Sequence, residues 1–245
     1  MHLPGYRERY ADAQAGSVLT VRPRSILVPP SVVTPQFRQQ KSAASPDAQV
    51  ANLSVTLDTP ATAGRLLVAG GCSDATLTAP SGFSLAEDAV DAQGAYLWYK
   101  IAVGGETTFT ITPGVSRPCA LVVAEYSGIA ASPLDQVSFS LSSGAPTVSA
   151  SPGAVPTTSQ AVELCVAVVC PHSFAENAQP VAPTWSNGFS GRDAVTSGFI
   201  ATGSQNSAVF LADFVTSSIG TPSTTATWTN SSQDYGAIMA TFKGV

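Results

Sequence analysis

Short runs in which apolar and polar residues alternate follow one another along most of the chain. In TTFTIT (107–112) the phenylalanine and the isoleucine fall on one face and the threonines on the other, and NLSVTL (52–57) and SFSLS (138–142) alternate in the same way. A period of two indicates strands that are buried on one face only. We therefore expect Phe139 and Leu141 in the third run to point into a core.

Other runs are apolar on both faces, namely LLVA (66–69), ALVVA (120–124) and LCVAVV (164–169). Strands of this kind lie in sheets that are covered on both sides. Glycine, proline, asparagine and aspartate separate the runs, for example at APSG (79–82) and SNG (186–188). The strand spacing of about 8 to 14 residues predicts an all-β fold, a jelly-roll-like antiparallel β-sandwich.

The pattern of residues 65–128 recurs in residues 163–244. RLLVAGGC at the start of the first copy matches ELCVAVVC at the start of the second, so that Cys72 and Cys170 are equivalent positions 98 residues apart. The offset between matched segments changes slowly along the copies, as loop insertions produce when the strands that they join stay in place. The body of the protein is therefore predicted to consist of two related halves.

We place the body at residues 47–245 and its halves at about 50–142 and 146–245. The linker between them, residues 142–160, is expected to contribute one strand near residues 147–150. Two small sandwiches and one pseudo-symmetric sandwich are both compatible with this pattern. We favour one body, because both copies contain wholly apolar strands that need covering on two sides.

The first 46 residues differ from the body. They hold six prolines and lack a clean helical or strand period, so alone they cannot bury enough apolar surface to offset their ordering entropy. We interpret residues 1–46 as an extended, Pro-rich, basic anchoring arm that docks onto another chain, with residues 21–35 as the docking strip. The alternative is an arm folded over its own body. The expected docking residues are Arg22, Arg24, Ile26, Leu27, Val28 and Phe37.

Charge separates the arm from the body. The arm carries six positive and two negative side chains and the remainder carries five and fourteen, within a net charge of −5. Charged residues make up 11% of the chain, against about 25% in typical domains, and such a neutral surface suits a protein held in an assembly. Deleting residues 1–46 is expected to leave a folded, soluble body that no longer assembles.

Signals for export, membrane insertion and nucleic-acid binding are weak. MHLPGYRERY (1–10) lacks the apolar core of a secretion signal, and the chain has no apolar span of about 18 residues. We expect synthesis in the cytoplasm and no membrane span. The net positive charge of the arm is spread over 46 residues, and the arm has no aromatic platform on which bases could stack. It therefore does not favour direct binding of nucleic acid.

The four cysteines are expected to be buried, reduced thiols that serve as small apolar residues. Cys72, Cys165 and Cys170 lie in or at the end of apolar runs, and Cys119 begins another. The sequence alone leaves open whether any two of these cysteines form a disulfide. Cys165 and Cys170 should not pair with each other, because an odd separation along one strand points their side chains to opposite faces.

Catalytic patterns are scarce. The histidines are His2 and His172, and we interpret His172 as a loop histidine. GFSG (188–191) lacks the G-x-S-x-G spacing of a nucleophile elbow. The acidic residues of EDAVD (87–91) are expected to form a solvated loop edge, since they lack the ligand spacing of a calcium loop and the cleft of a glycosidase. We expect no enzymatic activity, no cofactor and no metal.

Aromatic side chains offer one candidate for sugar binding. Tyr96 and Trp98 share one face of a strand and Tyr99 takes the other, which is best explained by core packing. Trp185 lies beside the SNGF turn and is the best candidate for an aromatic ring on a loop. If a glycan is bound, we expect it at Trp185 and at the tips around residues 87–94.

The order of these modules resembles a β-sandwich module of tailed-phage virion proteins, many of them minor tail or tail-tip proteins of phages that infect actinobacteria. The segments that carry the resemblance are TPATAGRLLVAGG (59–71), APSGFSLAED (79–88), AYLWYKIAVGGETTFTIT (95–112), CALVVAEYSGI (119–129) and AIMATFKGV (237–245). The resemblance covers roughly residues 50–245 and implies no catalytic residues.

The resemblance implies a structural virion protein, a minor tail or tail-tip component that the arm of residues 1–46 anchors to other virion proteins. A homo-oligomer, for example a trimer, fits the same expectation. Two alternatives remain: a capsid decoration protein of the same build, which stabilises the head, and an adhesion module that binds a host glycan. A depolymerising enzyme is disfavoured by the shortage of histidine and of paired carboxylates.

Overall fold

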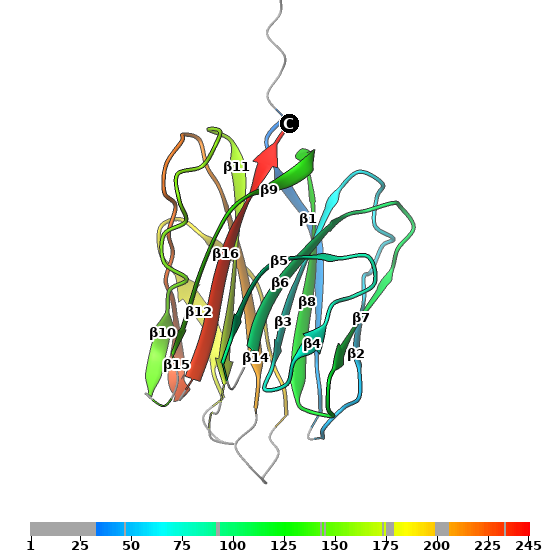
Figure 1. Cartoon of the computed structure of the whole chain (residues 1–245), viewed down its shortest axis with the longest axis vertical. Helices are drawn as coiled ribbons and strands as arrows, with labels where there is room; N and C mark the ends of the chain where they lie inside the picture. Colours follow the sequence, from blue (N-terminus) through cyan, green and yellow to red (C-terminus); the bar gives the residue numbers. More distant parts are fainter. Residues whose placement is uncertain are drawn as a thin grey trace, which may run out of the picture. The chain divides into compact units, whose positions relative to one another are not determined.

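Sixteen strands supply the regular structure of the residues that the computed structural model describes, which are 33–46, 48–91, 94–142, 144, 146–172, 174, 179–198, 206–232 and 234–245 (Figure 1). The first eight are β1 Gln36–Ala44, β2 Leu53–Thr56, β3 Leu66–Ser73, β4 Leu77–Thr78, β5 Ser84–Val90, β6 Gly94–Ile101, β7 Thr108–Pro113 and β8 Cys119–Ser127. The last eight are β9 Ile129–Ser142, β10 Thr147–Ala150, β11 Glu163–His172, β12 Val181–Trp185, β13 Ser190–Thr196, β14 Ala208–Val215, β15 Ala226–Ser232 and β16 Asp234–Gly244. The described residues contain no helix, so none that could cross a membrane.

The strands form four antiparallel sheets that repeat one topology. The first half gives a five-stranded sheet of order β1-β8-β3-β6-β5 and a three-stranded sheet of order β2-β7-β4. The second half gives β9-β16-β11-β14-β13 and β10-β15-β12, the same orders with each strand number raised by eight. The all-β, jelly-roll-like sandwich of two related halves that the sequence predicts is therefore confirmed.

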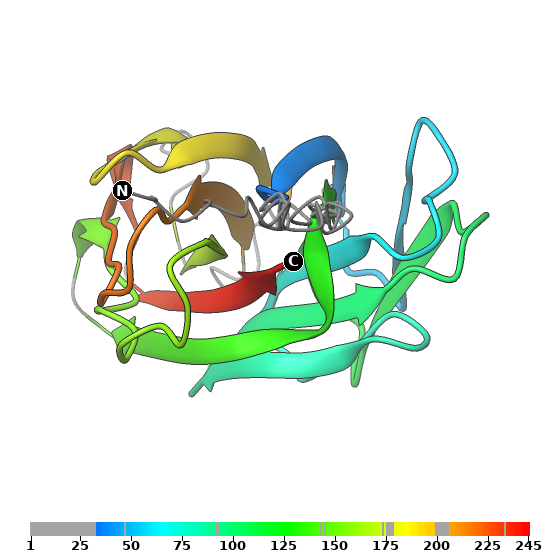
Figure 2. The same cartoon turned by 90° about the horizontal axis from the view of Figure 1, so that it is seen from above.

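Four layers follow one another across the described body, and three apolar cores lie between them (Figures 1 and 2). The two five-stranded sheets pack face to face over a central core that includes Leu66, Val68, Val166 and Val168. Each three-stranded sheet covers the other face of its own five-stranded sheet over an outer core. This arrangement explains why β3, β8 and β11 are apolar on both faces. Each half is a sandwich of its own, and the central core joins the two halves into one body.

The sheets approach most closely where glycine replaces a side chain. A Cβ on Gly70 would lie 2.9 Å from a Val168 methyl group, and a Cβ on Gly236 would lie 2.6 Å from the Cβ of Ala95. Both distances are shorter than carbon atoms tolerate. Glycine at these positions therefore allows β3 to pack against β11 and β16 against β6 across the central core.

The boundaries of the halves differ from the expected ones. Residues 36–44, which we assigned to the arm, form β1 at the edge of the first five-stranded sheet, where they pair with β8. Residues 129–142, which we assigned to the first half, form β9, which pairs with β16 as the counterpart of β1. The expected arm is therefore shortened to residues 1–32, which lie outside the described residues.

One expectation about the core is wrong. Phe139 and Leu141 of β9 remain 52% and 41% exposed. Both pair with residues of β16 on the face toward the central core, but β9 is an edge strand, and β5, which lies opposite it, is also an edge strand. The alternation in SFSLS correctly indicates a strand, but it does not reveal how much cover the strand receives.

The cysteine predictions are confirmed. Cys72, Cys119, Cys165 and Cys170 are all free and buried. Cys165 lies in an outer core of the second half and Cys170 lies in the central core, so their side chains point to opposite faces of β11. Burial raises the pKa of Cys119 and of Cys165 to about 12, which keeps both thiols protonated at neutral pH.

Candidate functional site

Of the residues expected to dock the arm on a partner, only Phe37 is described, and it belongs to the body. Arg22, Arg24, Ile26, Leu27 and Val28 lie outside the described residues. The Phe37 ring meets the Tyr126 ring edge to face at 5.8 Å, and the Arg192 guanidinium carbon lies 4.4 Å from the Phe37 ring centroid. Phe37 therefore packs within its own chain, which corrects its assignment as a docking residue.

Arg192 closes the edge of the central core between β1 and β13. Its Nε and Nη2 donate to the two carboxylate oxygens of Asp213, at 2.6 and 2.7 Å, while its flat face covers Phe37. The hydrogen bonds to Asp213 raise the pKa of Arg192, and burial raises the pKa of the adjacent Tyr126 well above its usual value. Planar, two-pronged pairing of this kind fixes geometry and satisfies a buried carboxylate. The sequence gives no signal for this pair.

Glu125 is a second buried carboxylate whose partners are structural. Its side chain is fully buried, and it accepts hydrogen bonds from the Thr62 backbone at 2.7 Å and from Gln39 Nε2 at 2.6 Å. Arg65 lies 3.5 Å away. These contacts tie the loop before β3 to β1 and β8, and they leave Glu125 without access to a substrate.

The arrangement most similar to a catalytic dyad is Cys72 with His172. The Cys72 sulfur lies 3.3 Å from His172 Nε2, and Ser207 Oγ lies 3.3 Å from His172 Nδ1. Burial raises the pKa of Cys72 well above its usual value and lowers the pKa of His172 to about 4. A cysteine nucleophile needs the opposite shifts, because only the thiolate attacks. Both groups are therefore neutral, and His172 is a buried strand residue of β11, where we had expected a loop histidine.

Protonation of His172 predicts a specific loss of stability in acid. Its folded pKa is about 4 and its unfolded pKa is about 6.5, so the folded state binds the proton more weakly. The contribution is fully present above pH 6.5 and is lost as the pH falls toward 4, by roughly 2 kcal/mol between pH 7 and pH 4.5. Urea unfolding at both pH values should show a smaller pH-dependent difference in His172→Gln than in the unchanged protein. Equal differences would contradict a buried neutral imidazole.

Trp185 lies at the end of β12 and is half-buried. It packs against both outer core clusters of the second half. It also lines a cavity of about 250 Å³ together with Pro183 and residues 191–194. The Trp185 ring forms part of the wall of this small cavity. That it contacts a glycan stays a prediction. Of the tips near residues 87–94, Glu87 and Asp88 lie in strand β5.

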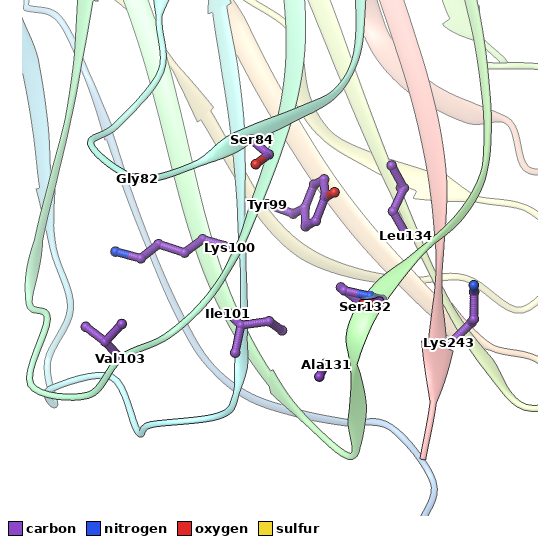
Figure 3. A pocket seen from close by; sticks show the side chains of 11 residues that line it. Gly82, Ser84, Tyr99, Lys100, Ile101, Val103, Ala131, Ser132, Leu134 and Lys243 are labelled. Carbon is purple, nitrogen blue, oxygen red and sulfur yellow. The ribbon is translucent and has the colours of Figure 1, made fainter.

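A larger cavity of about 570 Å³ lies at the edge formed by β5, β6 and β9 (Figure 3). The residues that line it are Gly82, Ser84, Tyr99, Lys100, Ile101, Val103, Ala131, Ser132, Pro133, Leu134 and Lys243. In the close view Tyr99, Ser132 and Leu134 face one another across it, from β6 and β9. Tyr99 was expected to pack in the core, and the sequence gives no signal for this cavity because its two walls come from different halves.

No protein-family model, curated protein or solved structure matches the chain. The function therefore has to be argued from the residues and the geometry. Within the described residues, no group of three or more histidine, cysteine or acidic side chains is arranged to hold a metal ion. The buried ionisable groups above act as structural contacts, and the cavity in Figure 3 is larger than the one beside Trp185.

Proposed function

We propose that this protein is a non-enzymatic structural component of a phage particle, a minor tail or tail-tip protein that residues 1–32 anchor to neighbouring virion proteins. The observation that carries the proposal is that the described residues, from 33 onward, form four hydrogen-bonded sheets and buried cores among themselves. We infer that residues 1–32 are available to another chain. Its composition, basic and rich in proline, suits an extended docking segment.

The point at which the arm joins the body supports an anchoring role. Val33 donates its backbone N–H to the carbonyl of Val245 at 3.1 Å, and Val245 donates to Gly128 at 3.2 Å. Val33, the residue that follows the arm, is therefore held beside the end of β16 and beside Gly128, which links β8 to β9. A pull on the arm would be transmitted to both five-stranded sheets and not to a single loop.

A mechanical role also fits the buried polar groups. Asp213 is neutralised by Arg192 and Glu125 is held by three partners, while His172 and Cys72 are kept neutral by burial. Paired or neutral groups are poor acids, bases or nucleophiles. The proposal includes an oligomeric, for example trimeric, assembly in the virion. Capsid decoration by the same anchored body is the alternative position in the particle.

Deletion of residues 1–32 tests the proposal. A phage that carries the shortened gene should yield a folded, soluble protein that is missing from purified particles, because only the docking segment has been removed. Immunoblotting of particles and of the lysate measures both pools, with the full-length gene as the control. Incorporation of the shortened protein at the normal level would contradict anchoring by the arm.

A further inference from the structure

The middle strands of the two five-stranded sheets, β3 and β11, are counterparts in the two halves. Each lies at the centre of its sheet, and the edge strands meet across the central core as β5 with β9 and β1 with β13. The strand β3 therefore lies opposite β11, and the two are in contact. Equivalent residues of the two halves meet at this pair of strands.

Cys72 of β3 and Cys170 of β11 are equivalent residues of this kind. Both are fully buried in the central core. The Cys170 sulfur lies 3.5 Å from the backbone oxygen of Gly71 on β3, and the Cys72 sulfur lies 3.3 Å from Nε2 of His172 on β11. Each sulfur thus reaches the strand that carries the other, and the two thiols interact directly.

The spacing of the sheets around this pair suits a disulfide, which needs about 3.5–4.5 Å between its two Cβ atoms. Gly70 and Val168 precede the two cysteines by two residues each, and a Cβ on Gly70 would lie 2.9 Å from a Val168 methyl group. Ala95 and Gly236 are the strand partners of the two cysteines. A Cβ on Gly236 would lie 2.6 Å from that of Ala95. The sheets are therefore close enough for a covalent bridge.

The other two cysteines point away from this pair. Cys119 lies in the outer core of the first half, and Cys165 lies in an outer core of the second half. Because side chains on opposite faces of a sheet cannot meet, the fold keeps both away from the central pair. The folded body therefore brings one pair of thiols together and separates the rest.

Burial restricts when these thiols can react. Both are free in the described structure. Burial, and after it the interaction with the Cys170 thiol, raises the pKa of Cys72 well above its usual value, which leaves little of the reactive thiolate. An oxidant also has to reach the sulfurs from solvent. The reaction should therefore take place while the central core is open, either during folding or in a transient opening.

We propose that Cys72 and Cys170 form a disulfide across the central core when the protein folds in an oxidising medium. The oxidant is a small-molecule disulfide such as oxidised glutathione. One cysteine thiolate attacks it and releases one glutathione, and the other cysteine thiolate then attacks the mixed disulfide and releases the second. The two cysteine thiols lose two electrons and two protons, and one glutathione disulfide becomes two glutathione thiols.

The bridge joins the two halves at the core that they share. It links residues that are 98 positions apart, so it restricts the unfolded chain strongly and stabilises the folded one. A reducing cytoplasm keeps the two thiols free, whereas an oxidising medium outside a cell preserves the bridge. The proposal goes beyond the structural role and holds whether or not the protein is part of a particle.

Refolding of the full chain from urea with oxidised and reduced glutathione tests the pairing. The remaining thiols are then alkylated in urea at slightly acidic pH, and proteolytic peptides are analysed by mass spectrometry. We expect a linked pair of peptides that contain Cys72 and Cys170, with Cys119 and Cys165 alkylated. Refolding with reduced glutathione alone is the control and should leave all four cysteines alkylated. Four alkylated cysteines after oxidative refolding, or a bridge to Cys119 or Cys165, would overturn the proposal.

Urea unfolding of the refolded protein tests whether the bridge fits the native fold. The oxidised protein should unfold at a urea concentration roughly 1 M or more above that of the reduced protein, because the bridge restricts the unfolded chain. Cys170→Ala should remove this difference, and Cys119→Ala, the matched control, should retain it. An equal or lower midpoint for the oxidised protein would contradict a bridge that the native packing accommodates.

Discussion

Deleting residues 1–46 is expected to unfold the body, whereas deleting residues 1–32 should leave its stability unchanged. The longer deletion removes β1, which pairs along the length of β8, and with it Phe37, which covers Tyr126 and Arg192. Loss of an edge strand and of this aromatic contact is comparable with the roughly 5–15 kcal/mol that stabilises a typical domain. Thermal unfolding followed by circular dichroism, with gel filtration, measures both variants.

The comparison of the two deletions separates folding from docking. A further variant, Phe37→Ala in the full chain, should lower the unfolding temperature without removing any of residues 1–32. If the protein that lacks residues 1–46 melted at the same temperature as the full chain, β1 would not be part of the core. Residues 36–44 would then return to the arm, as the sequence alone had indicated.

Phe242→Ala is expected to destabilise the whole body by about 3–5 kcal/mol, the usual cost of emptying the space of a buried aromatic ring. Phe242 of the second half is fully buried in the central core, and its ring lies 5.7 Å from the ring of Tyr99 in the first half. Because this core is shared, both halves should unfold in one transition at the lower urea concentration. Urea denaturation followed by tryptophan fluorescence measures the midpoint and the number of transitions.

Phe139→Ala is the matched control for this prediction. Phe139 belongs to the same half and faces the same side of its sheet, but it is 52% exposed, so its removal should cost less than about 1 kcal/mol. Two separate transitions in Phe242→Ala, with the first half unfolding at its original urea concentration, would contradict a shared core. The halves would then be independent sandwiches that merely touch.

The strands and the duplication could be predicted from the sequence because they depend on local patterns. Alternation marks half-buried strands such as β7, and runs that are apolar on both faces mark β3 and β11, which lie between two cores. The short strand β10 in the linker was also predicted at residues 147–150, where it occurs. Each of these signals needs only a few consecutive residues.

The edge strand β1 could not be predicted in this way. Its sequence, QFRQQKSAA, is polar with one aromatic residue, because an edge strand that is covered on one face needs little apolar surface. Its assignment to the sheet depends on pairing with β8, whose partner residues lie 91 positions further on at Gln36↔Ser127 and 76 at Ala44↔Ala120. The proline residues on either side, Pro35 and Pro46, made the segment resemble the arm.

The candidate site was hidden for a related reason. The cavity is lined by Tyr99 of β6 and by Ser132 and Leu134 of β9, which belong to different halves and share no sequence motif. Arg192 lies in a bulge of β13, and the equivalent bulge residue of β5 is Ala86, which has no long side chain. This difference becomes visible only when the registers of the two halves are compared. Trp185 was easier to select from the sequence because a tryptophan beside a turn is a local signal.

The account depends most on the claim that residues 1–32 attach the body to other proteins of a virus particle. A reconstruction of the purified particle by electron cryomicroscopy tests this most directly, because it identifies the chains that contact this segment. The account predicts that residues 1–32 lie against a different virion protein while residues 33–245 keep the four-layered body. Particles that lack the protein, or a segment that contacts only its own sandwich, would contradict it.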